Sequence, residues 1–341
     1  MSESPQLPRP SRNIGLDLVR VTEITAIRAG RWIGSGRRDR AHEAATQAMS
    51  EALNEVDIDG RIVIGEEGRL GQSSPLDTGQ PVGSGHGAPM DVVVDPIDGT
   101  WLLIRGFPGA VSLVGVAPRG SMHSLAPGVY MEKLIVGPAA AAALVPQCLD
   151  APAAWTLALI ARAKKKEVRD LAVFVLDRPR HHDLIEEIRA IGSRIVLRNE
   201  GDGEGALNAL TPGGVDVLMG IGGVSEGIIA ACAVKALGGG MLARLAPQSE
   251  TELAAIRAAG LDPQRIYTAD DLVQGDEVFF AATGITESAL LHSVQYHGRR
   301  VRTHSLLLRS ETRTRRFIRM EYWLSEEEHA EELRDWRAAN R

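Results

Sequence analysis

The most informative segment of the chain is Asp91-Val92-Val93-Val94-Asp95-Pro96-Ile97-Asp98-Gly99-Thr100. Its three consecutive valines predict a buried β-strand, because β-branched residues suit the pleated surface of a sheet. Asp95 and Asp98 follow the valines directly, and the proline and glycine beside them indicate a fixed turn. Since open α/β sheets bind ligands at the carboxyl ends of their strands, the stretch predicts an α/β fold with two carboxylates in a ligand crevice.

These two aspartates have two interpretations. Carboxylates held this close repel each other unless cations lie between them, and Mg²⁺ prefers oxygen ligands. The alternative is a surface turn in which both aspartates only bond to nearby backbone groups, the commoner role of a generic Asp-Pro turn.

A second acidic pair favours the metal interpretation. Glu66 and Glu67 follow another predicted strand, residues 61–64, so two neighbouring strands would aim carboxylates at one crevice. Two-metal phosphoryl-transfer sites need several carboxylates of this kind, and Thr100 supplies a hydroxyl that could orient an attacking water. The alternative for the glutamates is a solvated loop.

The turn Gly220-Ile221-Gly222-Gly223-Val224-Ser225-Glu226 stands between a predicted strand and a predicted helix. Such a turn also suggests a dinucleotide-binding loop, but Ser225 replaces the third glycine of that fingerprint. Glu226 would put a negative charge where a pyrophosphate binds. We therefore predict that Glu226 is a further metal ligand.

A basic turn, Arg178-Pro179-Arg180-His181, follows the predicted strand 171–176. Two arginines there could clamp phosphate oxygens bidentately. Basic residues that merely flank a sheet edge are an equally good interpretation of this turn taken alone.

The rest of the chain alternates between helical and strand patterns. Two amphipathic helices are predicted first, and the strand-helix alternation after residue 166 predicts a parallel sheet covered by helices. Between them we expect a strand at 111–116 and then a helix-rich stretch to about residue 163. We expect a flexible arm (1–12), an N-terminal metal-binding lobe (13–165), a C-terminal substrate-binding lobe (166–323) and a charged C-terminal helix (324–341). The apolar positions of the two helices are Leu16, Val19, Ile24, Ile27 and Trp32 in the first and Ala45, Met49, Ala52 and Val56 in the second.

Composition limits the function classes. The 341 residues carry a formal net charge of -6, which argues against a general nucleic-acid binder. The two isolated cysteines, Cys148 and Cys232, show no metal-binding spacing and fit a reducing cytoplasm. No apolar segment is long enough to predict a membrane span or a signal peptide.

These residues resemble the class II fructose-1,6-bisphosphatases, within the lithium-sensitive sugar and inositol phosphatase superfamily. The resemblance runs from about residue 14 to residue 322. It implies a layered αβαβα fold with mixed and parallel sheets. It also implies hydrolysis of a sugar phosphate with Mg²⁺ or Mn²⁺, either fructose 1,6-bisphosphate, sedoheptulose 1,7-bisphosphate or a related sugar phosphate. A homo-oligomer, dimer or tetramer, is expected. The supporting stretches are residues 61–66, 91–100, 130–134, 178–181, 220–227 and 282–286.

The resemblance also assigns roles to individual residues. Thr100 would activate water, with Glu66 as a catalytic neighbour. His42, which takes the place of a family aspartate, is either a core-facing histidine on the helical face of Ala45 and Met49 or the proton acceptor for the Thr100 and water pair. The implied metal ligands are Glu66, Asp95, Asp98 and Glu226. The implied substrate contacts are Asp98, Gly99, Thr100, Tyr130, Arg178, Arg180, Glu200, Asp202 and the backbone at Gly223.

Several positions depart from the family pattern, and they cluster around this one site. His42 stands where the family has an aspartate near the metals, Asp98 replaces a glutamate, and Glu200 replaces the first aspartate of an Asp-Gly-Asp motif. Arg38-Asp39 replaces a Lys-Asn pair, Ser225 replaces a proline, and an acidic insertion between residues 244 and 254 is shortened. The alternatives to an active phosphatase are therefore an impaired paralogue that binds sugar phosphate in a regulatory role and, less well supported, a nucleotide-binding α/β protein.

Overall fold

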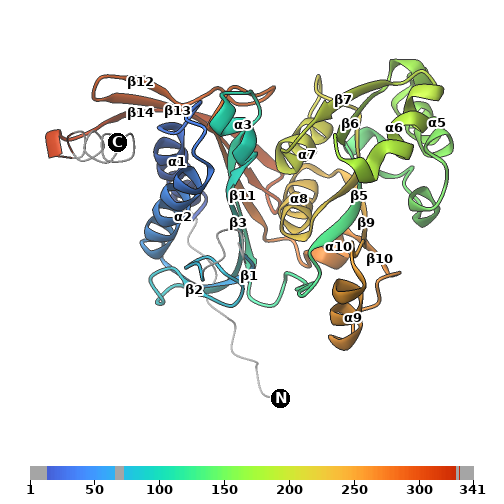
Figure 1. Ribbon diagram of the computed structural model, residues 1–341. Coiled ribbons are helices and arrows are strands. Elements are labelled where there is room, and N and C mark those ends of the chain that lie inside the picture. The colour runs from blue at the N-terminus through green and yellow to red at the C-terminus, as the bar shows by residue number, and fades with distance from the viewer. Residues whose placement is uncertain (1–13, 66–72, 328–329, 331–341) are drawn as a thin grey trace.

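The computed structural model describes residues 14–65, 73–327 and 330. The arm predicted for residues 1–12 lies outside this range, as does most of the predicted C-terminal helix, of which Glu326 and Glu327 are described as helical. The described residues form two β-sheets separated and covered by helices (Figure 1).

The first sheet has eight strands in the order β12-β13-β11-β4-β3-β1-β2, with β14 paired to β13. Only β1 and β3 are parallel, and all other neighbours are antiparallel. The sheet therefore combines strands from both ends of the chain. Its strands are β1 (Ile58–Ile64), β2 (Pro81–Val82), β3 (Ala88–Asp98), β4 (Val111–Pro118), β11 (Phe279–Gly284), β12 (Gln295–His297), β13 (Arg300–Arg309) and β14 (Thr314–Trp323).

The second sheet has six strands in the order β10-β9-β5-β8-β6-β7. The pairs β6–β7 and β6–β8 are parallel, and β5 pairs antiparallel with both β8 and β9. The predicted parallel alternation is thus confirmed for β6, β7 and β8 only. The strands are β5 (Tyr130–Val136), β6 (Ala172–Leu176), β7 (Arg194–Arg198), β8 (Val217–Gly223), β9 (Gly240–Leu245) and β10 (Ile266–Thr268).

Helices complete five layers. Helices α1 (Ile14–Gly30) and α2 (Arg38–Asn54) cover the outer face of the first sheet, and α7 (Asp202–Leu210) and α8 (Val224–Leu237) lie between the sheets (Figure 1). Helices α5 (Ala153–Lys164) and α6 (His182–Ala190) cover the far face of the second sheet. This is the predicted αβαβα order. The shorter elements are α3 (Thr100–Arg105), α4 (Pro138–Ala141), α9 (Glu250–Ala258), α10 (Ala269–Leu272) and the 3₁₀ helices Pro146–Leu149, Val168–Asp170 and Pro179–His181.

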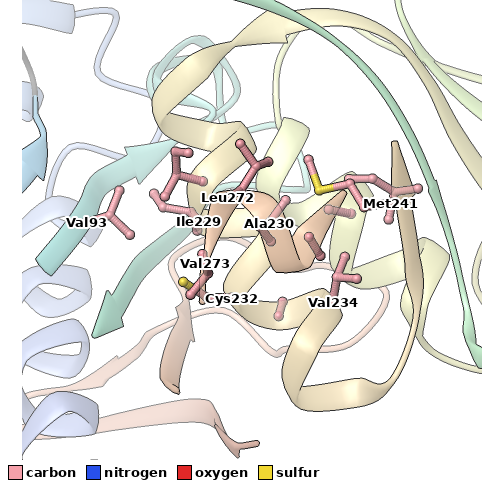
Figure 2. Close-up of a cluster of buried hydrophobic side chains, with 14 of the residues drawn as sticks. Val93, Ile229, Ala230, Cys232, Val234, Met241, Leu272 and Val273 are labelled. Carbon is pink, nitrogen blue, oxygen red and sulfur yellow. The ribbon is translucent and has the colours of Figure 1, made fainter. Parts of the chain in front are cut away.

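Helix α8 forms the centre of the core. Its residues Ile228 to Val234 are all buried, so the helix is apolar on every side, as a helix enclosed between two sheets must be. Figure 2 shows this packing: Ile229, Ala230, Cys232 and Val234 of α8 lie among side chains from both sheets and from α10. The sequence 224–237 therefore fixes the spacing of the two sheets.

Three features differ from the sequence-based expectations. Residues 130–136, expected in a helix-rich stretch, form strand β5, because alternate residues pack on opposite faces of the second sheet. On α1, Val19 and Ile27 are buried as expected, but Leu16 and Ile24 are 51% and 42% exposed. The lobes expected at 13–165 and 166–323 do not coincide with the two sheets, since β5 belongs to the second sheet and β11 to β14 belong to the first.

No helix in the described part of the chain is long and apolar enough to cross a membrane.

Candidate active site

Asp95 and Asp98 lie at the carboxyl end of β3, an interior strand of the first sheet. Both carboxylates are buried, 1% and 4% exposed, and the backbone N–H of Ile97 donates to Asp95 Oδ1 at 3.1 Å. Gly99 follows with φ of 90°, a left-handed conformation that side chains rarely adopt, and turns the chain into α3. Thr100, the first residue of α3, donates its hydroxyl to the carbonyl of Ile97 at 3.3 Å. The predicted turn therefore holds both aspartates and Thr100 in one place.

The carboxylate of Asp98 lies in strongly negative surroundings. Burial, followed by the charge of Asp95, raises its pKa well above the usual range, and Glu226 and Asp202 raise it further. The backbone N–H of Glu204 donates to Asp98 Oδ2 at 2.9 Å and opposes this rise. Divalent cations relieve such repulsion, and carboxylate oxygens are the donors that Mg²⁺ and Mn²⁺ prefer.

Glycines at the end of β8 leave room for two further carboxylates. A Cβ added to Gly222 would lie 1.6 Å from Asp202 Oδ2, and one added to Gly223 would lie 1.8 Å from Glu226 Oε2. The space that a pyrophosphate would need above this turn is therefore occupied by carboxylates. The negative charge beside this turn disfavours the dinucleotide-loop interpretation of Gly220 to Glu226, and the role of Glu226 as a metal ligand stays a prediction.

Lys133 on β5 was not predicted as a site residue. Its ammonium group pairs with Asp202 at the start of α7 and donates to the carbonyl of Gly223 at 3.1 Å. The Lys133 side chain is 2% exposed, so its charge is fully enclosed. One signal was available, a lysine within the stretch 130–134 that supported the resemblance, but only the pairing of β5 with β8 brings it to Asp202.

The predicted phosphate clamp is held in place by His181. Its Nε2 accepts from the backbone N–H of Ile221 at 2.7 Å, so its Nδ1 carries the proton and donates to the carbonyl of Leu176 at 2.7 Å. Burial lowers the pKa of His181, which favours this neutral form. The turn at the end of β6 is thereby fixed against β8.

Arg180 and Arg178 extend from this turn. The Arg180 guanidinium donates to the carbonyl of Ile221 at 2.8 Å and lies 5.1 Å from the ring centre of Tyr130. Arg178 lies 3.6 Å from Glu200 Oε1, while Glu200 Oε2 accepts from the backbone N–H of Trp101 at 2.9 Å. Glu200 therefore links the clamp to α3 and to Thr100 beside it.

One cavity of about 900 Å³ gathers most of the predicted site. Arg38, Trp101 and Asn199 also line it, although the sequence analysis gave them no role. The predicted site residues that line it are Asp95, Asp98, Gly99, Thr100, Tyr130, Arg178, Arg180, Glu200, Asp202, Gly223 and Glu226.

Two predicted residues are not placed with the others by the described part of the structure. Glu66 lies outside the described residues, and among those described no three His, Cys, Asp or Glu side chains form a ready metal cluster. His42 is buried on α2, 5% exposed, and does not line the cavity, whereas Arg38 one turn earlier does. The roles of Glu66 and His42 stay predictions.

Comparison with known proteins agrees with this geometry. A family model described as bacterial fructose-1,6-bisphosphatase, glpX-encoded, matches residues 12–322. The fructose-1,6-bisphosphatase 1 class 2 of Escherichia coli is 36% identical over 327 residues, which cover 92% of this chain and 96% of that protein. The fructose-1,6-bisphosphatase class 2 of Shigella flexneri has the same identity and coverage. The chain therefore belongs to the class II, glpX-type fructose-1,6-bisphosphatase family, whose members are metal-dependent phosphoric monoester hydrolases.

Proposed function

We propose that this protein hydrolyses a sugar bisphosphate, with fructose 1,6-bisphosphate as the first candidate and sedoheptulose 1,7-bisphosphate as the second. The observation that carries the proposal is the shared cavity, which is lined by Asp95 and Asp98 at the end of β3 and by Arg178 and Arg180 in the turn after β6. A substrate with two phosphates could engage both groups at once. The buried free thiols of the protein, Cys148 and Cys232, fit a location in the reducing cytoplasm.

The carboxylates of Asp95, Asp98 and Glu226, with Glu66 as a predicted fourth, would hold Mg²⁺ or Mn²⁺. When bound, such cations neutralise the charge of the phosphoryl oxygens. Arg178 and Arg180 hold the second phosphate through paired N–H donors, and Asp202 accepts from sugar hydroxyls beside them. The Thr100 hydroxyl orients the attacking water, and the sugar oxygen departs on the opposite side of the phosphorus.

A screen of phosphate release tests this proposal. The full-length protein, stripped with a chelator, is assayed with Mg²⁺ or Mn²⁺ against sugar monophosphates and bisphosphates. We expect release that depends on added metal and is fastest with a bisphosphate. A preference for monophosphates would contradict the role given to the two arginines.

The second candidate function is an impaired paralogue that binds sugar phosphate without turnover. It is favoured by His42, which replaces a family aspartate and lies buried away from the cavity. Calorimetric binding of fructose 1,6-bisphosphate with no phosphate released under either metal would select this candidate over the first.

A further inference from the structure

Strand β14 is an unprotected edge of the first sheet. All ten of its residues pair with β13, from Arg309 opposite Thr314 to Arg300 opposite Trp323. Within the described residues no strand pairs with its other side. Half of its backbone N–H and C=O groups therefore point away from the sheet, and natural proteins usually shorten, cover or bulge an edge of this length.

The side chains of β14 are exposed on both faces of the sheet. Among them are Phe317, Tyr322 and Trp323, which are 45%, 39% and 67% exposed. In Figure 1 the outer part of the β13–β14 ribbon extends beyond α1. Large aromatic side chains on an unpaired edge are typical of a surface that another protein covers.

The sequence of β14 is complementary to itself. Consider β14 paired antiparallel with β14 of a second copy, the two related by a two-fold axis perpendicular to the sheet. A residue that lies a given number of positions before the axis in one copy is then opposite the residue that lies the same number of positions after the axis in the other copy, and both side chains are on the same face. With the axis at Ile318, Arg315 lies opposite Glu321 of the second copy, and Phe317 lies opposite Arg319. Each pair occurs twice. Opposite charges and an arginine beside an aromatic ring are favourable cross-strand pairs.

The contacts within one chain leave Arg315 without a carboxylate and Glu321 with two arginines. Arg315 lies over the Phe317 ring at 5.5 Å and has no carboxylate partner among the described residues. Glu321 Oε1 accepts from Arg302 at 2.5 Å and its Oε2 lies 3.9 Å from Arg300 Nη1, so Arg315 of a second copy would share this carboxylate with the two arginines of β13. A register one step further along would instead place Arg319 opposite itself, which like charges disfavour.

We propose that β14 pairs with β14 of a second copy of this chain, antiparallel about a two-fold axis at Ile318. The two first sheets then form one continuous sheet across a dimer. The residues of β14 do not line the active-site cavity, so the dimer forms without blocking substrate.

Charge exchange tests the proposed register. The full chain and its variants are measured by analytical ultracentrifugation over a range of concentrations. Arg315→Glu and Glu321→Arg each place like charges opposite one another twice, so each should weaken the dimer at least tenfold. The double variant Arg315→Glu/Glu321→Arg restores opposite charges and should dimerise like the wild type, and a mixture of the two single variants should form heterodimers. Arg257→Glu, an exposed change on α9, is the matched control and should leave the dimer unchanged.

Disulfide trapping gives a second, independent test. Ile318→Cys places two thiols opposite each other at the axis, and diamide should link them into a dimer on a non-reducing gel. The native cysteines are buried and do not compete. Ser310→Cys, in the turn before β14, should not be trapped. Three results would each overturn the proposal: a monomeric wild type, single charge variants that dimerise normally, or no disulfide at residue 318. If the chain's own C-terminal residues cover β14, the disulfide at residue 318 will not form.

Discussion

Lys133 of β5 and Asp202 of α7 form an ion pair in which the two side chains are only 2% and 9% exposed. Breaking a buried pair leaves one charge enclosed without a partner, which costs more than the pair itself contributes. The pair also fixes Asp202, a predicted substrate contact, against the carbonyl of Gly223 through the same ammonium group.

Lys133→Met should therefore lower the free energy of unfolding by about 3–5 kcal/mol and raise KM. The double variant Lys133→Met/Asp202→Asn should recover much of the stability, because no unpaired charge stays buried, while KM stays high. Thermal unfolding and steady-state kinetics on the same samples separate the two effects. A double variant no more stable than the single one would show that the pair does not act as a unit.

Asp95→Asn should leave the fold intact and reduce metal-dependent hydrolysis by roughly a thousandfold, on the order of 4 kcal/mol of transition-state stabilisation. An amide cannot supply the negative charge that the cations require. Asp91→Asn is the matched control: Asp91 is also buried on β3, but it accepts from the backbone N–H of Met122 at 3.0 Å and does not line the cavity. This control should lose stability but keep its turnover. Near-normal turnover in Asp95→Asn would remove Asp95 from the metal site.

Arg180→Ala should raise KM for a bisphosphate by about tenfold, which corresponds to roughly 1.4 kcal/mol of binding free energy. A fall in kcat as well would mean that the contact tightens during transfer. Arg189→Ala, on the exposed side of α6, should change neither constant. Unchanged kinetics in Arg180→Ala would make its bond to Ile221 purely structural.

His42 is the residue at which the family resemblance and the chain differ most. If its neutral imidazole accepts a proton from the Thr100 and water pair, activity falls on the acid side with one titration. That titration should disappear in His42→Ala, and His42→Asp should restore turnover over a broader acid range. An acid limb that is identical in both variants would make His42 a core residue, in keeping with its burial on α2.

The burial of the Glu23 carboxyl group predicts that the stability of the protein depends on pH. Glu23 is 2% exposed on α1, and burial raises its pKa, although the hydroxyls of Thr303 and Ser305 donate to it at 3.0 and 3.2 Å. Because the folded pKa is above the unfolded one, the unfolded state releases this proton first, and stability falls as pH rises from about 4.5.

Glu23→Gln should therefore unfold at a higher temperature than the wild type at pH 7–8, by roughly 1 kcal/mol or about 2 °C, and should match it below pH 4.5. The exposed Glu51→Gln should show no such difference. A constant offset between wild type and Glu23→Gln at all pH values would contradict this origin.

The elements that the sequence predicts well are those whose pattern is local. Val92 to Val94 followed by Asp95 predicts β3 with carboxylates at its carboxyl end, and the alternation after residue 166 predicts a helix from Glu226, which is α8. Strand β5 escapes prediction because Glu132 and Lys133 make it look polar. Their partners, Arg244 on β9 and Asp202 on α7, are distant in sequence. The exposed Leu16 and Ile24 show the converse, since helical spacing alone does not tell which apolar stripe faces the sheet.

The position of β11 in the first sheet also constrains how the chain is made. Strand β4, which ends at Pro118, pairs with β3 on one side and on the other with β11, which begins at Phe279, so the ribosome must synthesise the whole second sheet before β4 acquires its second neighbour. Until then β4, the neighbour of the strand that carries Asp95 and Asp98, has an open edge in the nascent chain. Pairing over such a sequence separation is slow and leaves the waiting strands prone to aggregation. Premature termination between β10 and β11 therefore yields a polypeptide that contains most of the predicted site residues but cannot complete the sheet that holds Asp95 and Asp98.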